Sequence, residues 1–370
     1  MMGPETRMKQ RAGSVLACFL ILFASQILAQ DAPVVRCRYV TDEGVSIDAV
    51  AKILVEAQDG GRLIERNDGR IVSVDPGQWE DSTDVLAADA WAIQPSEFTK
   101  QLQREFGSSF RVKSSPHYYI VTDSSPAYVT RVQTLFETLH KNFFTYWKNQ
   151  GVSLDKPTTP LVAVVLKSRA SYLAFAKPNI GESAQTMIGY YDPFSNWIVT
   201  YDVPDFERNV ATIIHEATHQ LAFNVGLQRR MADNPLWVSE GLATYFESPD
   251  RRDPRKWRAI GIFNQVNFDR LKRYWPSRGS DSLKTLIESN RRFESASTAG
   301  AAYGESWALT YFLIRTRKNE YIDYLARLRA TPLLAELSPS ERVAMFCEAF
   351  NADLNEIDKQ FRRYMLRLRR

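Results

Sequence analysis

Two histidines four positions apart, with a glutamate beside the first, form the most chemically informative pattern in the sequence. They are His215, Glu216 and His219. On a helix, residues four apart lie on one face, so both imidazoles can reach one metal ion while the Glu216 carboxylate flanks it. The pattern predicts a metal site with a general base beside it. Packing alone can also place two histidines at this spacing, so a third ligand is needed to decide.

Glu240 is the candidate third ligand. It follows His219 by twenty-one residues and opens a second predicted helix, which a turn through 229–235 can fold back against the first. An exposed helical glutamate is the ordinary alternative, but apolar neighbours indicate that Glu240 faces inward. A buried carboxylate needs a cation. Two histidines and a carboxylate are a ligand set of catalytic zinc sites, which keep one position for water.

These two strings together resemble the paired signature of gluzincin metallopeptidases, particularly the aminopeptidase N clan. The first string runs from His215 to His219, and the second is Trp237-x-x-Glu240-Gly241-x-Ala243-x-Tyr245-x-Glu247. They are also similar to the peptidase-like domain of a family of exported bacterial proteins of unknown function. The motifs cover about thirty-five residues, with looser similarity from about His117 to Leu328.

The resemblance implies a zinc-dependent metallopeptidase with one Zn²⁺ per chain, bound by His215, His219 and Glu240. Glu216 would act as the general base toward a zinc-activated water. In the aminopeptidase clan, a tyrosine at the start of a later helix hydrogen-bonds the oxyanion. Tyr303 matches it in spacing, although ordinary packing is the alternative for this residue.

Glu247 is a further candidate, because it lies seven residues after Glu240 and therefore on the same helix face. A carboxylate there can orient a ligand histidine through its free ring N–H. A surface carboxylate is the competing interpretation. His117 and His140, the two remaining histidines, are interpreted as structural.

Two features depart from the aminopeptidases. The Gly-x-Met-Glu-Asn segment that anchors a substrate amino terminus in those enzymes has no counterpart before His215. Residues 196–201 are expected at the place of the substrate-pairing edge strand and carry no acidic anchor. Aminopeptidase activity is therefore not expected. The alternatives to a peptidase are a non-proteolytic, zinc-containing binding module and a zinc hydrolase of a non-peptide amide.

The elements that must position these residues predict an α+β chain. We expect a signal peptide at 1–30, a small β-rich N-terminal region at 31–90 and a helical connector at 91–116. A gluzincin-like metallopeptidase domain follows at 117–330, and a helical C-terminal tail at 331–370. The domain is predicted to hold a small mixed sheet, a helix capped at Asp205 that carries both histidines, and a mainly helical second half.

Residues 1–30 combine a basic start with an apolar run from Ala12 to Leu28, which is typical of a secretory signal peptide. An uncleaved membrane anchor is the alternative. Export predicts a periplasmic or extracellular protein. Two cysteines then remain, Cys37 and Cys347, and both a disulfide and two separate thiols stay open.

The charge balance argues against a nucleic-acid partner. The formal net charge is +4, from 47 Lys and Arg against 43 Asp and Glu, and the first thirty residues contain three of the former and one of the latter. The remaining chain is nearly neutral, so it lacks the basic field that nucleic-acid binding uses. The expected partner is a peptide or protein substrate. The sequence does not predict the oligomeric state.

Overall fold

The structure is a computed structural model, and it describes residues 32–248, 257 and 260–368. The predicted signal peptide lies outside these residues. None of the described helices is both long and apolar enough to cross a membrane. The α+β class, with a β-rich N-terminal region ahead of a mainly helical C-terminal half, is confirmed.

The first sheet contains five antiparallel strands in the order β4-β3-β2-β1-β5. Their bounds are β1 Val34–Val40, β2 Ser46–Glu56, β3 Arg62–Arg66, β4 Ile71–Val74 and β5 Trp79–Val85. Gly60 and Gly69 take left-handed φ values of 92° and 91° in the tight turns that join β2, β3 and β4, which glycine adopts without strain. The predicted β-rich N-terminal region is therefore confirmed, with β5 returning to pair with β1.

The second sheet is mixed and has the order β6-β7-β8-β10-β9. Its strands are β6 Arg111–Ser114, β7 Tyr118–Thr122, β8 Leu161–Leu166, β9 Gly189–Asp192 and β10 Trp197–Tyr201. The β7–β8 and β8–β10 pairs are parallel, whereas β6–β7 and β10–β9 are antiparallel. The sheet includes β6, which precedes the predicted start of the domain at residue 117.

The expectation that residues 196–201 form the edge strand is wrong. Strand β10 lies between β8 and β9, so β9 is at the edge. The physical reason is that β9 and β10 form a hairpin. Its second strand, β10, pairs in parallel with β8, which leaves its first strand, β9, on the outside.

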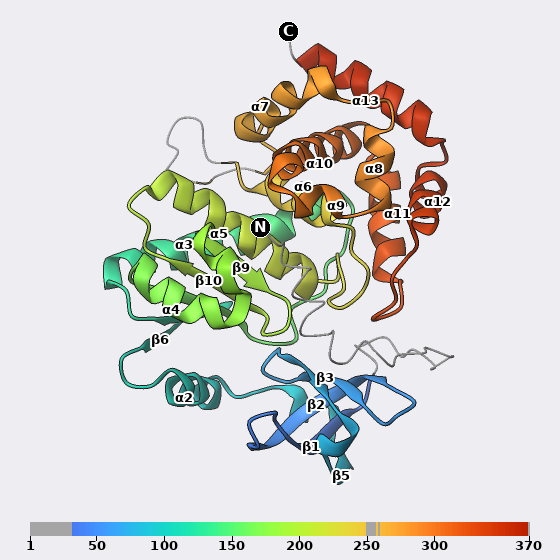
Figure 1. Ribbon diagram of the computed structural model, residues 1–370. Helices are drawn as coiled ribbons and strands as arrows, with labels where there is room; N and C mark the ends of the chain where they lie inside the picture. The colour runs from blue at the N-terminus through green and yellow to red at the C-terminus, as the bar shows by residue number, and fades with distance from the viewer. Residues whose placement is uncertain (1–31, 249–256, 258–259, 369–370) are drawn as a thin grey trace.

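Helices cover both faces of this sheet (Figure 1). Four helices do so: α2 Pro95–Phe106, α3 Pro126–Asn149, α4 Arg169–Ile180 and α5 Phe206–Asn224. Strand β8 is buried along its whole length. Its alternate residues enter two different cores, one shared with α3 and α5 and the other with α2 and α4.

The C-terminal half is helical. It comprises α6 Leu236–Phe246, α7 Gln265–Tyr274, α8 Ser282–Glu288, α9 Arg291–Glu294, α10 Ala296–Thr316, α11 Lys318–Arg329, α12 Pro339–Phe350 and α13 Leu354–Leu368. Helix α10 lies among the others (Figure 1). The segment predicted as a tail, 331–370, contributes Phe346, Phe361 and Met365 to the same core as α3 and α5.

Cys37 is buried in the N-terminal sheet and Cys347 lies in α12, and both are free thiols. Of the two alternatives for these residues, the structure therefore has separate thiols. Burial raises the pKa of the Cys37 thiol to about 11, so it stays protonated and unreactive at neutral pH.

Candidate metal centre

Helix α5 presents both histidines because its ends are fixed by local sequence. The Asp205 side chain accepts a hydrogen bond from the Arg208 backbone N–H at 3.2 Å, which caps the first turn as predicted. Gly226, with φ of 79°, lies just past the last helical residue, Asn224. The turn at Asn196, which precedes β10, is tied to this end by hydrogen bonds between the Asn196 and Asn224 side chains.

Helix α6 brings Glu240 to α5. Residues 237–246 of α6 are all buried, so this short helix has no solvent-facing side. Gly241 explains how close it lies to α10: an added Cβ would be 2.2 Å from Thr310 Oγ1 and 2.8 Å from the Ser306 carbonyl oxygen. Only glycine allows this approach. Glu240 is itself among these buried residues, so it faces inward as predicted.

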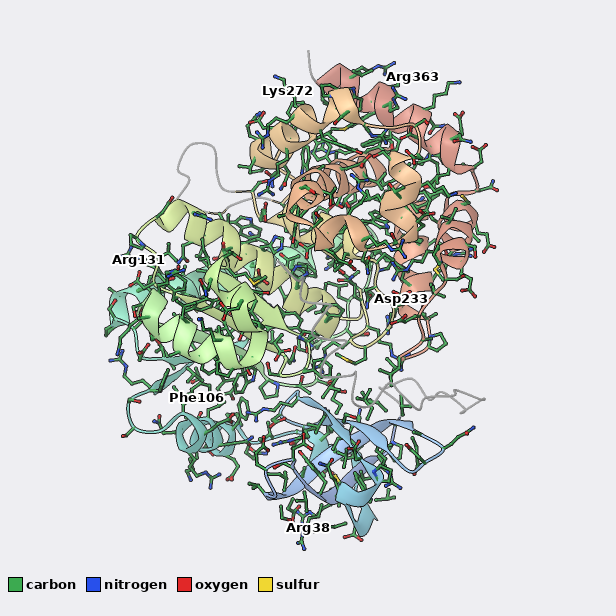
Figure 2. All side chains as sticks on the ribbon, in the orientation of Figure 1. Arg38, Phe106, Arg131, Asp233, Lys272 and Arg363 are labelled. Carbon is green, nitrogen blue, oxygen red and sulfur yellow. The ribbon has the colours of Figure 1, made fainter. Side chains whose placement is uncertain are left out.

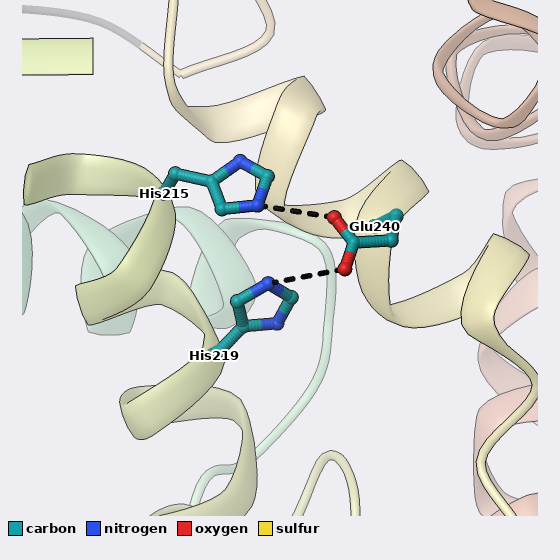
Figure 3. A group of neighbouring side chains, drawn as sticks. All are labelled: His215, His219 and Glu240. Carbon is teal, nitrogen blue, oxygen red and sulfur yellow. Dashed lines mark hydrogen bonds and ion pairs between the residues drawn. The ribbon is translucent and has the colours of Figure 1, made fainter. Parts of the chain in front are cut away.

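The three predicted ligands converge (Figure 3). The Nε2 atom of His215 lies 3.1 Å from Oε2 of Glu240, and Nε2 of His219 lies 3.8 Å from Oε1 of the same carboxylate. One ligand atom from each residue lies within 4.8 Å of the others, so this group can hold a metal ion. Among the residues that the structure describes, it is the one group of three or more potential ligands with this property.

Glu247 holds the far side of His215. Its Oε2 atom is 2.6 Å from His215 Nδ1, which leaves Nε2 directed at the metal position. Its Oε1 atom accepts hydrogen bonds from the Asn264 and Asn267 side chains at 2.9 and 3.1 Å. The prediction that Glu247 orients a ligand histidine therefore agrees with this geometry, and the surface alternative does not.

Asn264 and Asn267 are site residues that the sequence argument did not identify. Asn264 caps α7 by accepting a hydrogen bond from the Asn267 backbone N–H at 3.1 Å. An asparagine just before a helix signals a cap, but nothing in the sequence indicates that its amide also reaches Glu247, because that contact joins two separate helices.

Glu216 lies beside the ligand group and is partly buried. Its Oε2 atom accepts a hydrogen bond of 2.8 Å from the Tyr191 backbone N–H, on edge strand β9. Burial raises the pKa of Glu216 to about 7, and the negative charge of Glu240 adds to this effect. A backbone donor leaves no side-chain signature, so the sequence could not predict this contact.

The ligand side chains differ in protonation because their partners differ. Burial lowers the pKa of His219 to about 4, so its imidazole is neutral and has a lone pair to offer. Burial also acts to lower the pKa of His215, but hydrogen bonds to Glu240 and Glu247 raise it well above the usual value. Burial opposes ionisation of Glu240, yet the hydrogen bond from His215 and the two nearby histidines lower its pKa.

Tyr303 also lies at this site. It lies close enough to Glu240 to help lower the pKa of that carboxyl, and its ring packs edge-on against Phe293, with the ring centroids 5.4 Å apart. It belongs to the third turn of α10 and not to a helix start, unlike the tyrosine of the resembling clan. The following residue, Gly304, lets α10 approach α7, because an added Cβ would be 2.7 Å from the Leu271 backbone nitrogen.

Comparison with known proteins adds one finding. No curated protein matches the chain closely enough to count as a relative. Residues 209–334 match a family described as a protein of unknown function, DUF1570. The matched segment includes the metal centre and Tyr303, and it agrees with the expected likeness to a family of unknown function. It names no peptidase family, so over this segment the chain is similar to proteins whose activity is itself an open question.

Proposed function

We propose that this protein is a zinc-dependent metallopeptidase that hydrolyses peptide bonds. The observation that carries the proposal is the convergence of His215, His219 and Glu240, with the partly buried carboxylate of Glu216 beside them. A structural zinc site would offer four protein ligands, whereas three protein ligands and a neighbouring base are typical of hydrolytic sites.

The donor set fits zinc. Zinc bonds of about 2.0–2.1 Å in tetrahedral geometry put neighbouring ligand atoms roughly 3.3 Å apart. The separations of 3.1 and 3.8 Å between the imidazole nitrogens and the Glu240 carboxylate bracket that value. The hydrogen bond from Glu247 to the other ring nitrogen of His215 is the support that zinc-binding histidines usually have.

When bound, zinc supplies Lewis acidity that polarises a carbonyl and makes water a nucleophile near neutral pH. Glu216 is suited to accept the proton of that water, because its carboxylate lies beside the three ligand residues without being one of them. The hydrogen bond from the Tyr191 backbone N–H fixes the carboxylate in place. Glu216 would then hand the proton to the leaving amine.

Tyr303 would stabilise the oxyanion that forms at the attacked carbonyl. The negative charge of Glu240, together with burial, raises the pKa of its hydroxyl well above the usual value. The hydroxyl therefore keeps its proton at neutral pH and remains a hydrogen-bond donor. A donor of this kind stabilises a transition state by about 2.7–4 kcal/mol.

The test combines metal analysis with digestion of a broad peptide library. We expect about one zinc per chain in the wild type, by analogy with single-zinc catalytic sites. Glu216→Gln should retain zinc and lose cleavage, whereas His215→Ala should lose zinc. Glu97→Gln, at an exposed position on α2, is the control with the same chemical change.

The outcomes separate the alternatives. A wild-type protein without stoichiometric zinc would contradict the enzyme proposal altogether. Stoichiometric zinc with an intact library would favour a zinc-containing binding module or a hydrolase of non-peptide amides. Cleavage that persists in Glu216→Gln would remove Glu216 from the mechanism.

A further inference from the structure

A cavity separate from the metal centre lies where the N-terminal sheet meets the helical part. Its walls come from β2, β3, the loop ahead of β8, the turn after α5 and the end of α11. It encloses about 120 Å³, whereas one water needs roughly 10–15 Å³. The exposed Lys156 and Thr158 lie at its rim, and the buried Gln228 and Arg230 line it more deeply. It is large enough for a polyatomic group.

The lining is strongly basic. One acidic residue, Glu65, lines the cavity. Five cationic residues line it as well: Lys52, Lys156, Arg229, Arg230 and Arg329. The Lys52 ammonium lies 4.7 Å from the centre of the Trp91 ring. Such a concentration of one charge in a recess attracts anions.

Two of the arginines are fixed by the protein itself. Arg230 pairs with Glu65 and donates to the carbonyl oxygens of Gly69 and Pro193 at 2.6 and 3.2 Å. Arg329 donates to the Gly226 carbonyl at 3.0 Å and lies 3.3 Å from the Asp155 carboxylate. These contacts hold a rigid wall that joins the N-terminal sheet to the end of α5.

The remaining pair of cations, Arg229 and Lys156, has no such partner. Among the described residues, the Arg229 guanidinium and the Lys156 ammonium make no hydrogen bond or ion pair. Arg229 is half-buried, and its pKa is lowered by burial and by the charge of Arg329. A partly buried cation beside a second cation is destabilising unless an anion compensates it.

We propose that this cavity binds an anionic group, a carboxylate or phosphate, through Arg229 and Lys156 against the wall formed by Arg230 and Arg329. A guanidinium matches the two oxygens of such a group with parallel hydrogen bonds. The proposal gives the N-terminal sheet a role, since Lys52 and Glu65 place it in the wall of a binding site.

The position of the cavity indicates where the anionic group comes from. Phe223 lines the cavity and follows His219 by four residues, so it lies one helical turn, about 6 Å, along the same face of α5. The Phe223 ring stacks on Tyr191, with centroids 5.8 Å apart, and the Tyr191 backbone holds Glu216. An extended peptide spans that distance in about two residues. We therefore assign the anionic group to an acidic residue of the substrate, close to the cleaved bond. This assignment rests on the proposed peptidase function.

The experiment measures binding and not turnover. The protein is the Glu216→Gln variant, which cannot cleave under the proposed function, with metal removed by a chelator. Binding is measured by calorimetry. The first probe is inorganic phosphate. The second is a pair of terminally blocked pentapeptides, one with Glu and the other with Gln at a single position and otherwise identical. The affinities are compared with and without Arg229→Gln or Lys156→Gln.

We expect phosphate to bind. Arg229→Gln should lower the affinity for phosphate about tenfold or more, because a charge-assisted hydrogen bond is lost. Arg363→Gln makes the same charge change on α13, at the opposite end of the molecule from Arg38 of the N-terminal sheet (Figure 2), and should leave affinity unchanged. Preference for the Glu peptide that disappears in Arg229→Gln would identify the source as a substrate residue. Phosphate binding without that preference would identify a free anion and refute the substrate source.

Absence of Arg229-dependent binding by both probes would overturn the proposal. Equal weakening in Arg363→Gln would also overturn it, because it would reflect net charge alone. The phosphate measurement uses metal-free protein, so it stands whether or not the chain is a zinc peptidase. Thermal unfolding of each variant checks that the fold is retained.

Discussion

At the scale of single residues, the candidate metal centre is defined by how its three side chains are held as much as by their identity. His215 is fixed between Glu240 and Glu247, and Glu247 is fixed in turn by two asparagines from α7. His219 has the simpler environment and is neutral through burial. The two histidines therefore contribute differently, although they look equivalent in the sequence.

Glu247→Gln tests that support. The amide lacks the charge that holds the His215 ring N–H, so we expect zinc affinity to fall by about 10- to 100-fold. Competition with a chromophoric chelator measures the affinity. Glu97→Gln is the surface control, and equal affinities in the wild type and Glu247→Gln would show that Glu247 does not support the metal.

Tyr303→Phe tests the oxyanion role. Loss of one hydroxyl donor should lower kcat by about 10²–10³-fold while zinc content stays the same. Tyr311→Phe is the matched control, since Tyr311 is a buried tyrosine two turns later on α10. Unchanged turnover in Tyr303→Phe, or an equal loss in both variants, would contradict the assignment.

At the scale of elements, helix–helix spacing determines the position of Glu240 and Tyr303. Each is followed by a glycine at a close crossing: Gly241 between α6 and α10, and Gly304 between α10 and α7. Protein interiors are close-packed, so even one added methyl group must displace something. The two glycines thus bring both side chains toward the same site.

Gly241→Ala should force α6 away from α10. We expect a loss of about 1–3 kcal/mol in the free energy of unfolding, as overpacked sites show, and weaker zinc binding because Glu240 moves with its helix. Urea denaturation of metal-free protein measures the first effect. Gly300→Ala is the control in α10, where an added Cβ meets nothing within 4 Å and should stabilise the helix slightly. An unaltered stability in Gly241→Ala would refute the close-approach argument.

At the scale of the whole molecule, the N-terminal sheet, the mixed sheet and the C-terminal helices are joined around α5. Helix α13 enters this assembly through a buried ionic network in which Arg278 pairs with Glu305 of α10 and with Asp358 of α13. On the mixed sheet, the His117 and His140 rings stack with centroids 3.7 Å apart, which joins the start of β7 to α3. Both histidines lie outside the metal centre, in agreement with their structural interpretation.

His140 makes global stability depend on pH. Burial, with the nearby charge of His117, lowers the pKa of His140 to about 4, against an unfolded value of about 6.5. Above pH 6.5 His140 is neutral in both the folded and the unfolded chain, so its contribution to the free energy of unfolding is fully present. As the pH falls from 6.5 to about 4, the unfolded chain binds a proton that the folded chain does not, so stability decreases.

His140→Phe removes this titration and keeps a ring beside Phe144. We expect the loss in unfolding free energy between pH 7.5 and pH 5 to be smaller in the variant than in the wild type. Urea denaturation of metal-free protein at the two pH values measures the difference. Identical losses in both proteins would show that His140 does not couple protonation to folding.

The sequence by itself determined the local features. The spacing of His215, Glu216 and His219 indicated a shared helix face, and Asp205 marked the start of that helix. These predictions agree with the structure because each depends on residues a few positions apart. The α+β class followed from the same local periodicities.

Only the tertiary structure decided which distant groups meet. It placed β9 and not β10 at the sheet edge, brought Asn264 and Asn267 to Glu247, and assembled the basic cavity from β2, α5 and α11. Such contacts depend on strand order and on the distances between packed helices, which arise from the burial of whole surfaces. No local spacing of residue types encodes them, so the candidate metal ligands could be identified from the sequence while most of their surroundings could not.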